Sequence, residues 1–121
     1  MRKKRILIVD DQRDVAMLLH HQLDLQDCEI EEIYSGSQAL KQIFKGGYDL
    51  VLLDFDMKDI KGDRICLMLR SDDNFNALPI IIITAHVELD ERVFREYGAN
   101  KVLYKPVESD DLIAAVKECL K

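Results

Sequence analysis

The sequence has few cysteines, and they are not arranged for a disulfide framework or a zinc site. There are three of them, an odd number, and no Cys-x-x-Cys pair occurs. A disulfide framework needs paired cysteines, and a zinc site needs ligands at short, regular spacing. We therefore expect free thiols with mainly structural roles at Cys28, Cys66 and Cys119.

Long hydrophobic runs are also missing. No apolar stretch approaches the roughly 18 residues that a membrane-spanning helix needs. The basic N-terminus is followed by the short apolar run Ile6–Val9, which is too short for the apolar region of a secretory signal peptide. The sequence therefore predicts a cytoplasmic protein without a membrane span.

Basic charge is not in excess. The chain carries 17 Lys and Arg against 23 Asp and Glu, which gives a net charge of −6. Non-specific nucleic-acid binding depends on Lys and Arg, so we expect no nucleic-acid binding by this domain. With 48% hydrophobic residues in a chain of 121, there is enough apolar material for a core. We expect one domain over residues 1–121.

Short apolar runs alternate with helical patterns along the chain. Four runs rich in Ile and Val are typical of strands buried on both faces, and the less apolar run Glu29–Tyr34 predicts an edge strand. Five strands alternating with five helices predict an α/β fold, with a parallel sheet, helices on both faces and right-handed crossovers. The four buried strands are expected at Ile6–Val9, Leu50–Leu53, Ile80–Ile83 and Val102–Tyr104.

Between the predicted strands, apolar residues recur at helical spacing. Each such stripe predicts the buried face of one helix rather than a contact with a cofactor. The stripes comprise Val15, Leu18, Leu19 and Leu23; Ala39, Leu40, Ile43 and Phe44; Ile65, Met68 and Leu69; Leu89, Val93 and Tyr97; and Leu112, Val116 and Leu120.

Polar residues follow the predicted central strands. In sheets of this kind, ligands bind beyond the carboxyl ends of the strands, so these residues should share one edge. Each alone has a structural explanation, because Asp and Thr often cap helices and Lys is often a solvated charge. Their convergence on one edge favours a functional site. The residues are Asp10 and Asp11 after the first strand, Asp54 and Asp56 after the third, Thr84 after the fourth and Lys105 after the fifth.

These residue types together indicate phosphoryl chemistry. Three carboxylates in one cleft repel one another and gain from a bound cation. An all-oxygen site suits Mg²⁺, which keeps waters and accepts a phosphoryl oxygen. Lys105 can hold a phosphoryl group as a point charge, and the Thr84 hydroxyl can hydrogen-bond it. A carboxylate can attack phosphorus and form an acyl phosphate, and Asp54 at a strand tip is the candidate nucleophile.

Four segments, in this order and spacing, resemble the CheY-like receiver domain of two-component response regulators. The resemblance covers almost the whole chain, roughly Lys4 to Leu120. It implies a flavodoxin-like, doubly wound parallel sheet with strand order 2-1-3-4-5. The segments are ILIVDDQ, LVLLDFDMKDIKG, IIITA and VLYKP.

The resemblance also implies how the phosphoryl group is handled. Asp54 would accept it from a phosphohistidine on a sensor histidine kinase or a histidine phosphotransfer protein. Thr84 and Lys105 would contact its oxygens, and the Lys105-Pro106 peptide would be cis. The domain would not be an enzyme beyond its own phosphotransfer and autodephosphorylation.

A metal site and a switch are implied as well. Asp10 and Asp11 would bind Mg²⁺, directly or through water, with Asp54 and the main-chain carbonyl of Asp56. The Asp56 carboxylate would then be free to face solvent. Phosphorylation would change binding to an unknown downstream protein partner, with the domain a monomer or a weak dimer.

Some positions depart from the family pattern. Lys58 stands where many members have Pro. Val102 occupies the position of an aromatic residue that swings inward on phosphorylation, and strand alternation puts Tyr104 on the same face as Val102. We therefore expect a smaller rearrangement than is usual in the family. His86, two residues after Thr84, is either a polar residue opening the fourth helix or a group near the path of attacking water.

Two alternatives stay open at this point. Asp54-x-Asp56 also resembles the nucleophile motif of haloacid-dehalogenase-type phosphatases, but those enzymes place it on their first strand and leave Asp10 and Asp11 unexplained. The other alternative is a receiver that no longer switches and acts as a scaffold, which Val102 favours. The sequence ends soon after the fifth predicted helix, so we expect either a stand-alone receiver or a fragment of a longer regulator or hybrid kinase.

Overall fold

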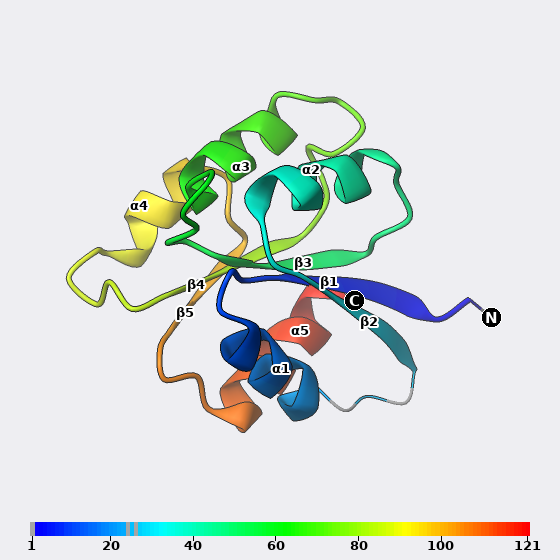
Figure 1. The fold of residues 1–121 in the computed structure, drawn as a ribbon, viewed down its shortest axis with the longest axis vertical. Coiled ribbons are helices and arrows are strands. Elements are labelled where there is room, and N and C mark those ends of the chain that lie inside the picture. Colours follow the sequence, from blue (N-terminus) through cyan, green and yellow to red (C-terminus); the bar gives the residue numbers. More distant parts are fainter. Residues whose placement is uncertain (1, 24, 26) are drawn as a thin grey trace.

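A parallel five-stranded sheet forms the centre of the protein (Figure 1). The computed structural model describes residues 2–23, 25 and 27–121. The strand order is β2-β1-β3-β4-β5, and every neighbouring pair is parallel, which confirms the flavodoxin-like order 2-1-3-4-5. The strands are β1 (Lys4–Val9), β2 (Cys28–Ile33), β3 (Leu50–Asp54), β4 (Ile80–Thr84) and β5 (Lys101–Tyr104).

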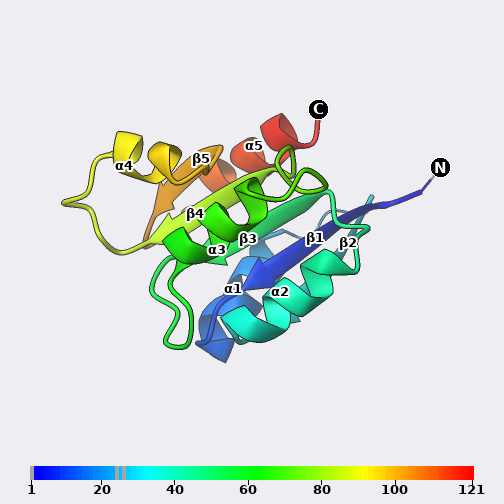
Figure 2. The same ribbon diagram turned by 90° about the horizontal axis from the view of Figure 1, so that it is seen from above.

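Helices cover both faces of the sheet, as predicted. Figures 1 and 2 show α2, α3 and α4 on one face and α1 and α5 on the other. Right-handed crossovers produce this division, because the chain winds first toward β2 and then back across β1 toward β5. None of the helices in the described residues is both long and apolar enough to cross a membrane. The helices are α1 (Arg13–Gln22), α2 (Gly36–Phe44), α3 (Gly62–Arg70), α4 (Glu91–Glu96) and α5 (Ser109–Cys119).

Alternation along the strands builds two separate cores. In β1, Leu7 and Val9 pack into the cluster under α2, α3 and α4, whereas Ile6 and Ile8 pack into the cluster under α1 and α5. Successive side chains of a strand point to opposite faces, so a strand covered on both sides needs apolar residues at every position. All residues of β3 and β4 are buried, which explains their unbroken Leu, Val and Ile runs.

The predicted helix stripes are wider than the buried faces. Leu18, Phe44 and Met68 were expected in the core, but they are 56%, 45% and 44% exposed. A helix on a sheet buries only part of its surface, so residues at the margin of a stripe stay outside. Conversely, Phe94 is fully buried and packs edge-to-face on Phe55, with ring centroids 5.1 Å apart. The prediction for the fourth helix did not include it.

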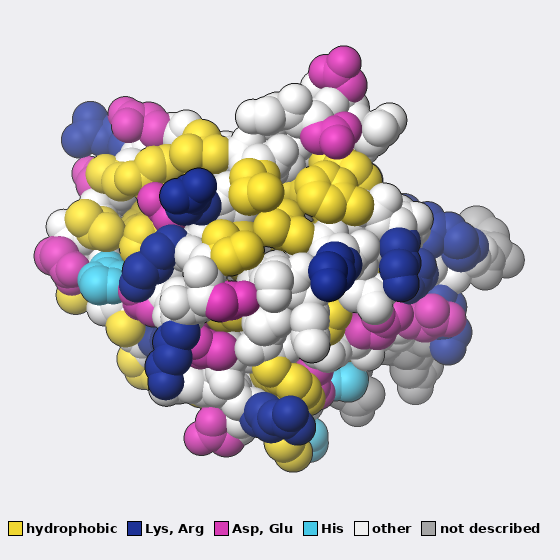
Figure 3. Space-filling model, turned by 45° about the horizontal axis from the view of Figure 1, so that its top comes forward, with side chains coloured by type: hydrophobic (Ala, Val, Ile, Leu, Met, Phe, Trp, Pro, Cys, Tyr) yellow, Lys and Arg dark blue, Asp and Glu magenta, His cyan; other side chains and the backbone are white. Residues whose placement is uncertain are grey.

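Exposed hydrophobic side chains gather on the helical face that carries α2 and α3, as Figure 3 shows. Phe44 is one of them, and its ring packs edge-to-face on Phe75 with centroids 5.2 Å apart. Apolar atoms make up a large share of the surface of any folded protein, so exposed apolar side chains on this face do not by themselves indicate a ligand.

Gly62 lets α3 begin directly against the end of β3. A Cβ at this position would lie 2.9 Å from the Cα of Phe55 and 3.0 Å from the carbonyl oxygen of Asp54. Both are backbone atoms, which cannot move aside as a flexible side chain can. The N–H of Gly62 donates to the Phe55 carbonyl at 2.9 Å and closes the loop between β3 and α3. The absence of a side chain is therefore a requirement of this loop.

We expect Gly62→Ala to lower the free energy of unfolding by about 1–3 kcal/mol, because the backbone must shift to make room. Urea unfolding measures the change. Asp63→Ala at the next residue is the matched control and should lower it by less than about 1 kcal/mol, since it removes only a favourable charge from a helix start. Equal losses in the two variants would contradict the packing argument.

Candidate functional site

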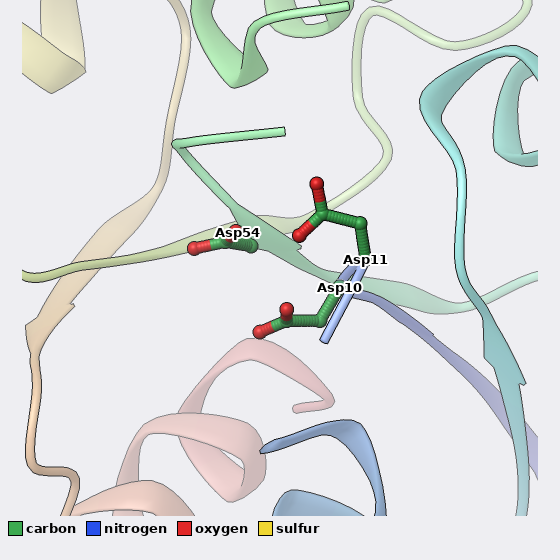
Figure 4. Close-up of side chains that lie close together, drawn as sticks. All are labelled: Asp10, Asp11 and Asp54. Atoms are coloured by element: carbon green, nitrogen blue, oxygen red, sulfur yellow. The ribbon is translucent and has the colours of Figure 1, made fainter. Parts of the chain in front are cut away.

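Three carboxylates meet where β1 and β3 end. Asp10 and Asp11 directly follow β1, and Asp54 is the last residue of β3. The two strands are hydrogen-bonded neighbours with Val9 opposite Leu53, so their ends share one edge of the sheet. Each carboxylate offers an oxygen within 4.8 Å of the others, and Figure 4 shows the three side chains gathered there. The structure thus brings together Asp10, Asp11 and Asp54, whereas the carboxylate of Asp56 is not part of this group.

Lys105 supplies positive charge to this cluster. It follows β5, and its Nζ lies 3.1 Å from Asp54 Oδ1 and 3.6 Å from Asp10 Oδ2. Its backbone N–H donates to the carbonyl of Thr84 at 2.8 Å, which fixes the residue beside the end of β4. The Lys105-Pro106 peptide is cis, as the resemblance implied. One ammonium group therefore contacts two of the acids.

The charges at this site are poorly balanced. Burial raises the pKa of the Asp10 carboxyl to about 6; the backbone N–H of Gln12 opposes the rise and the charge of Asp54 adds to it. Burial also raises the pKa of Asp54, although Lys105 opposes that rise. For Lys105, burial lowers the pKa, but the carboxylates of Asp54 and Asp10 outweigh it and leave the pKa raised. The buried acids therefore hold more negative charge than one lysine compensates.

The donor set fits a hard divalent cation. Asp10 is 1% exposed, and among the described residues its Oδ2 atom has no hydrogen-bond partner. A buried carboxylate oxygen without a partner is costly. Carboxylate oxygens are the ligands that Mg²⁺ prefers, together with waters and phosphoryl oxygens. Lys105 Nζ approaches this oxygen only to 3.6 Å, so a cation within the cluster would give Asp10 a closer partner.

Asp56 does not behave as expected. Its carboxylate was predicted to be free to face solvent, but Oδ1 lies 2.8 Å from His86 Nε2 and 4.0 Å from Lys61 Nζ. The side chain is 38% exposed, so it does face solvent in part, but it is not free, because His86 in the loop after β4 contacts it. Within the described residues the main-chain carbonyl of Asp56 accepts no backbone hydrogen bond, so it remains available as a ligand.

His86 connects the loops after β3 and β4. Its Nδ1 lies 2.7 Å from Glu88 Oε1, and its Nε2 contacts Asp56 as described. The hydrogen bonds with Glu88 and Asp56 raise the pKa of His86, because an imidazolium can donate from both nitrogens. Since α4 begins only at Glu91, His86 does not open that helix. Asp56 is thirty residues away in the chain, and no local signal in the sequence predicts this contact.

Thr84 ends β4 beside Asp54. It is fully buried, and the register of β3 and β4 places Asp54 opposite the preceding residue, Ile83. Its Oγ1 accepts a hydrogen bond from the backbone N–H of His86 at 3.0 Å. The hydroxyl proton therefore stays available for a further acceptor.

Tyr104 pairs with Thr84 in the sheet and reaches the loop after β4. The two residues are opposite each other in β4 and β5. The Tyr104 hydroxyl donates to the carbonyl of Leu89 at 2.9 Å, and its ring packs on the same core cluster as Val102. The prediction that these two residues share a face is confirmed.

The fold and the site together define a class of protein. It is a doubly wound α/β domain with an acidic cluster and a lysine at the carboxyl edge of its sheet. Residues 6–117 match the family described as "Response regulator receiver domain", and the chain belongs to this family. It is a signalling domain of two-component systems, and the phosphatase alternative is not favoured.

Curated relatives and solved structures agree with this assignment. "Response regulator ArlR" of Staphylococcus saprophyticus is 31% identical over 118 residues, which cover 97% of this chain and 52% of the relative. The chain thus spans about half the length of the curated relatives it matches. The crystal structure of a putative response regulator from Chloroflexus aurantiacus has a TM-score of 0.91 and 34% identity, with 98% of both chains covered. A sensor protein from Polaromonas sp. JS666 has a TM-score of 0.87 and 27% identity, with 97% of this chain and 95% of that chain covered.

The acidic cluster generates a prediction about metal. Mg²⁺ should stabilise the fold, by about 1.4 kcal/mol at ten times its dissociation constant, because it binds the folded state alone. Asp11→Ala should remove most of this gain, whereas Asp14→Ala removes an equal charge from the start of α1 and should keep it. Thermal unfolding with Mg²⁺ and with EDTA measures the effect. An unchanged Mg²⁺ response in Asp11→Ala would rule out Asp11 as a ligand.

Proposed function

We propose that residues 1–121 form one receiver domain in which Asp54 accepts a phosphoryl group beside a bound Mg²⁺ ion. The observation that carries this proposal is the position of Asp54. It is 5% exposed at the tip of a central strand, with Lys105 Nζ at 3.1 Å and two further carboxylates in reach. A nucleophile, a cation site and a phosphate-binding ammonium group therefore occupy one edge of the sheet.

Mg²⁺ would be held by Asp10, Asp11, Asp54 and the main-chain carbonyl of Asp56. When bound, it supplies positive charge that offsets the acids and the phosphoryl oxygens. Among the residues that the structure describes, Oδ2 of Asp10 has no hydrogen-bond partner and the carbonyl of Asp56 accepts no backbone hydrogen bond. Both observations support this set of ligands.

The transfer itself uses the side chains of this chain. An Asp54 oxygen forms a bond to phosphorus as the phosphorus–nitrogen bond of a phosphohistidine breaks, and the electron pair of that bond stays with the imidazole nitrogen. Lys105 already contacts Asp54 and would hold a phosphoryl oxygen as charge moves onto it. The Thr84 hydroxyl, which keeps its proton, would donate to another phosphoryl oxygen. Apart from its own phosphotransfer and autodephosphorylation, the domain would not be an enzyme.

The partners follow from this chemistry. The donor would be a sensor histidine kinase or a histidine phosphotransfer protein in the cytoplasm, and the output would be contact with a downstream protein by a monomer or weak dimer. The net charge of −6 disfavours nucleic-acid binding by this domain. Relatives called response regulators extend well beyond the matched region, which is compatible with a receiver that works beside a separate output domain.

The role of Asp54 is tested by replacing it. Asp54→Asn should abolish labelling by acetyl phosphate or phosphoramidate in the presence of Mg²⁺, because an amide is a far weaker nucleophile than a carboxylate. Asp63 lies on α3, and the control variant Asp63→Asn should be labelled like the parent protein. Intact-mass spectrometry with peptide mapping reports the modification. Full labelling of Asp54→Asn, with phosphate mapped to another residue, would defeat the assignment.

The switch would act through the loop between β4 and α4. The phosphoryl group would contact Thr84 and Lys105 and so favour one conformation of this loop over another. Two side-chain contacts hold the loop in the structure: His86 contacts Asp56, and Tyr104 binds the carbonyl of Leu89. The output surface would be formed by α4, β5 and α5, and Val102 in place of an aromatic residue would leave the loop to carry most of the change.

Beryllofluoride, a phosphoryl mimic, tests the switch. Crystal structures with and without it should differ in the backbone of residues 84–91, and hydrogen exchange of this segment should change in solution. The β2 strand, at the opposite edge of the sheet, provides an internal control and should not respond. If residues 84–91 superimpose within coordinate error and their exchange is unchanged, the switch is contradicted and the scaffold alternative is supported.

A further inference from the structure

Helix α2 takes part of its N-terminal cap from another part of the chain. Its first turn contains no acidic residue, and the side-chain hydroxyl of the N-cap Ser35 accepts from the N–H of Gln38 at 3.2 Å. The N–H groups of Gly36 and Ser37 instead donate to the two carboxylate oxygens of Asp59, at 2.9 and 3.0 Å. Asp59 lies in the loop between β3 and α3, which also carries Asp56. This loop is therefore attached to the start of α2.

The attachment is close and fully hydrogen-bonded. Asp59 Oδ1 also accepts from the N–H of Ile60 at 2.9 Å. The N–H of Ser37 lowers the pKa of Asp59, and the N–H groups of Gly36 and Ile60 act in the same direction, so the carboxylate stays ionised at the positive end of α2. A Cβ on Gly36 would lie 3.1 Å from Asp59 Oδ1. The loop and the helix start therefore leave little room for relative movement.

Lys58, the residue before Asp59 in the same loop, contacts the acidic cluster. The backbone N–H of Lys58 donates to Asp11 Oδ2 at 3.0 Å. Consecutive residues thus contact α2 on one side and Asp11 on the other. Pro, which is common at the position of Lys58 in this family, has no N–H and cannot make this bond. The connection from α2 to Asp11 therefore depends on the residue that departs from the pattern.

We propose that Asp59 is a positioning residue for the metal site. It anchors the loop between β3 and α3 to the start of α2, and so places the Lys58 N–H against Asp11 and the Asp56 carbonyl beside the acidic cluster. The proposal rests on the proposed function only in taking this cluster as the Mg²⁺ site. Groups that orient metal ligands without touching the metal commonly change metal affinity when removed.

The test compares two variants that remove the same charge. Asp59→Ala should raise the Mg²⁺ dissociation constant about tenfold, as is typical for loss of a group that orients a ligand. Asp63→Ala removes a carboxylate that accepts a hydrogen bond from the adjacent Arg64 N–H, and it should leave the dissociation constant near that of the parent protein. Isothermal titration calorimetry at a temperature where both variants are folded separates affinity from stability. A purely structural role for Asp59 would lower the unfolding temperature in EDTA and leave the dissociation constant unchanged.

Asp59→Asn and the Lys58 variants complete the design. Asn keeps one acceptor oxygen and loses the other, so Asp59→Asn should bind Mg²⁺ with intermediate affinity. Lys58→Pro removes the N–H that holds Asp11, whereas Lys58→Ala keeps it. Mg²⁺ should therefore bind more weakly to Lys58→Pro than to Lys58→Ala, and this pair decides the matter if Asp59→Ala does not fold.

The outcomes are distinguishable. Equal Mg²⁺ affinity in Asp59→Ala and Asp63→Ala overturns the positioning role. If Asp59→Ala is unfolded, equal affinity in Lys58→Pro and Lys58→Ala overturns it in the same way. Failure of the parent protein to bind Mg²⁺ contradicts the proposed metal site, and with it this inference.

Discussion

The burial of Asp10 and Asp54 against a single lysine is the interaction on which the site depends. Carboxylates at the ends of adjacent parallel strands cannot separate, because the strands are fixed by the sheet. Lys105 contacts both acids but cannot neutralise both, and Asp11 adds a third negative charge to the cluster. The fold thus creates a demand for positive charge, which explains why a cation and a phosphoryl group would bind at the same edge.

The loop between β3 and α3 is fixed beside the acidic cluster by three contacts. Asp59 attaches it to α2, the Lys58 N–H attaches it to Asp11, and His86 attaches it to the loop after β4. A rigid loop would suit the proposed ligand role of the Asp56 carbonyl, because a main-chain carbonyl is held in place only if its backbone is fixed. The loop after β4 is held through side chains, by His86 and by Tyr104. Such contacts can exchange without unfolding a strand or a helix, which suits an element that switches.

The general layout of the site could be predicted, but its supporting contacts could not. Strand ends are visible as the points where apolar runs stop, so Asp54 and Lys105 could be placed at one edge from the pattern alone. The contacts between Asp59 and Gly36 and between His86 and Asp56 join residues 23 and 30 positions apart. These contacts depend on how the loop after β3 packs against the start of α2 and against the loop after β4. The spacing of apolar residues in the sequence carries no information about such packing. For the same reason, the prediction for the Asp56 carboxylate missed its contact with His86.

The alternation of strands and helices could be predicted from the sequence alone, since short unbroken apolar runs such as Ile80–Ile83 and Leu50–Leu53 are typical of strands covered on both faces. The net charge and the lack of long apolar runs argued against nucleic-acid binding and against a membrane span. The strand order came from the family resemblance, because periodicity records which face of an element is apolar and not which neighbour covers it. The folded structure was needed to show that Leu18, Phe44 and Met68 stay exposed, that Phe94 is buried in the core and that Asp59 caps a distant helix. Burial and hydrogen bonding depend on the contacts between elements, and those contacts exist only once the chain has folded.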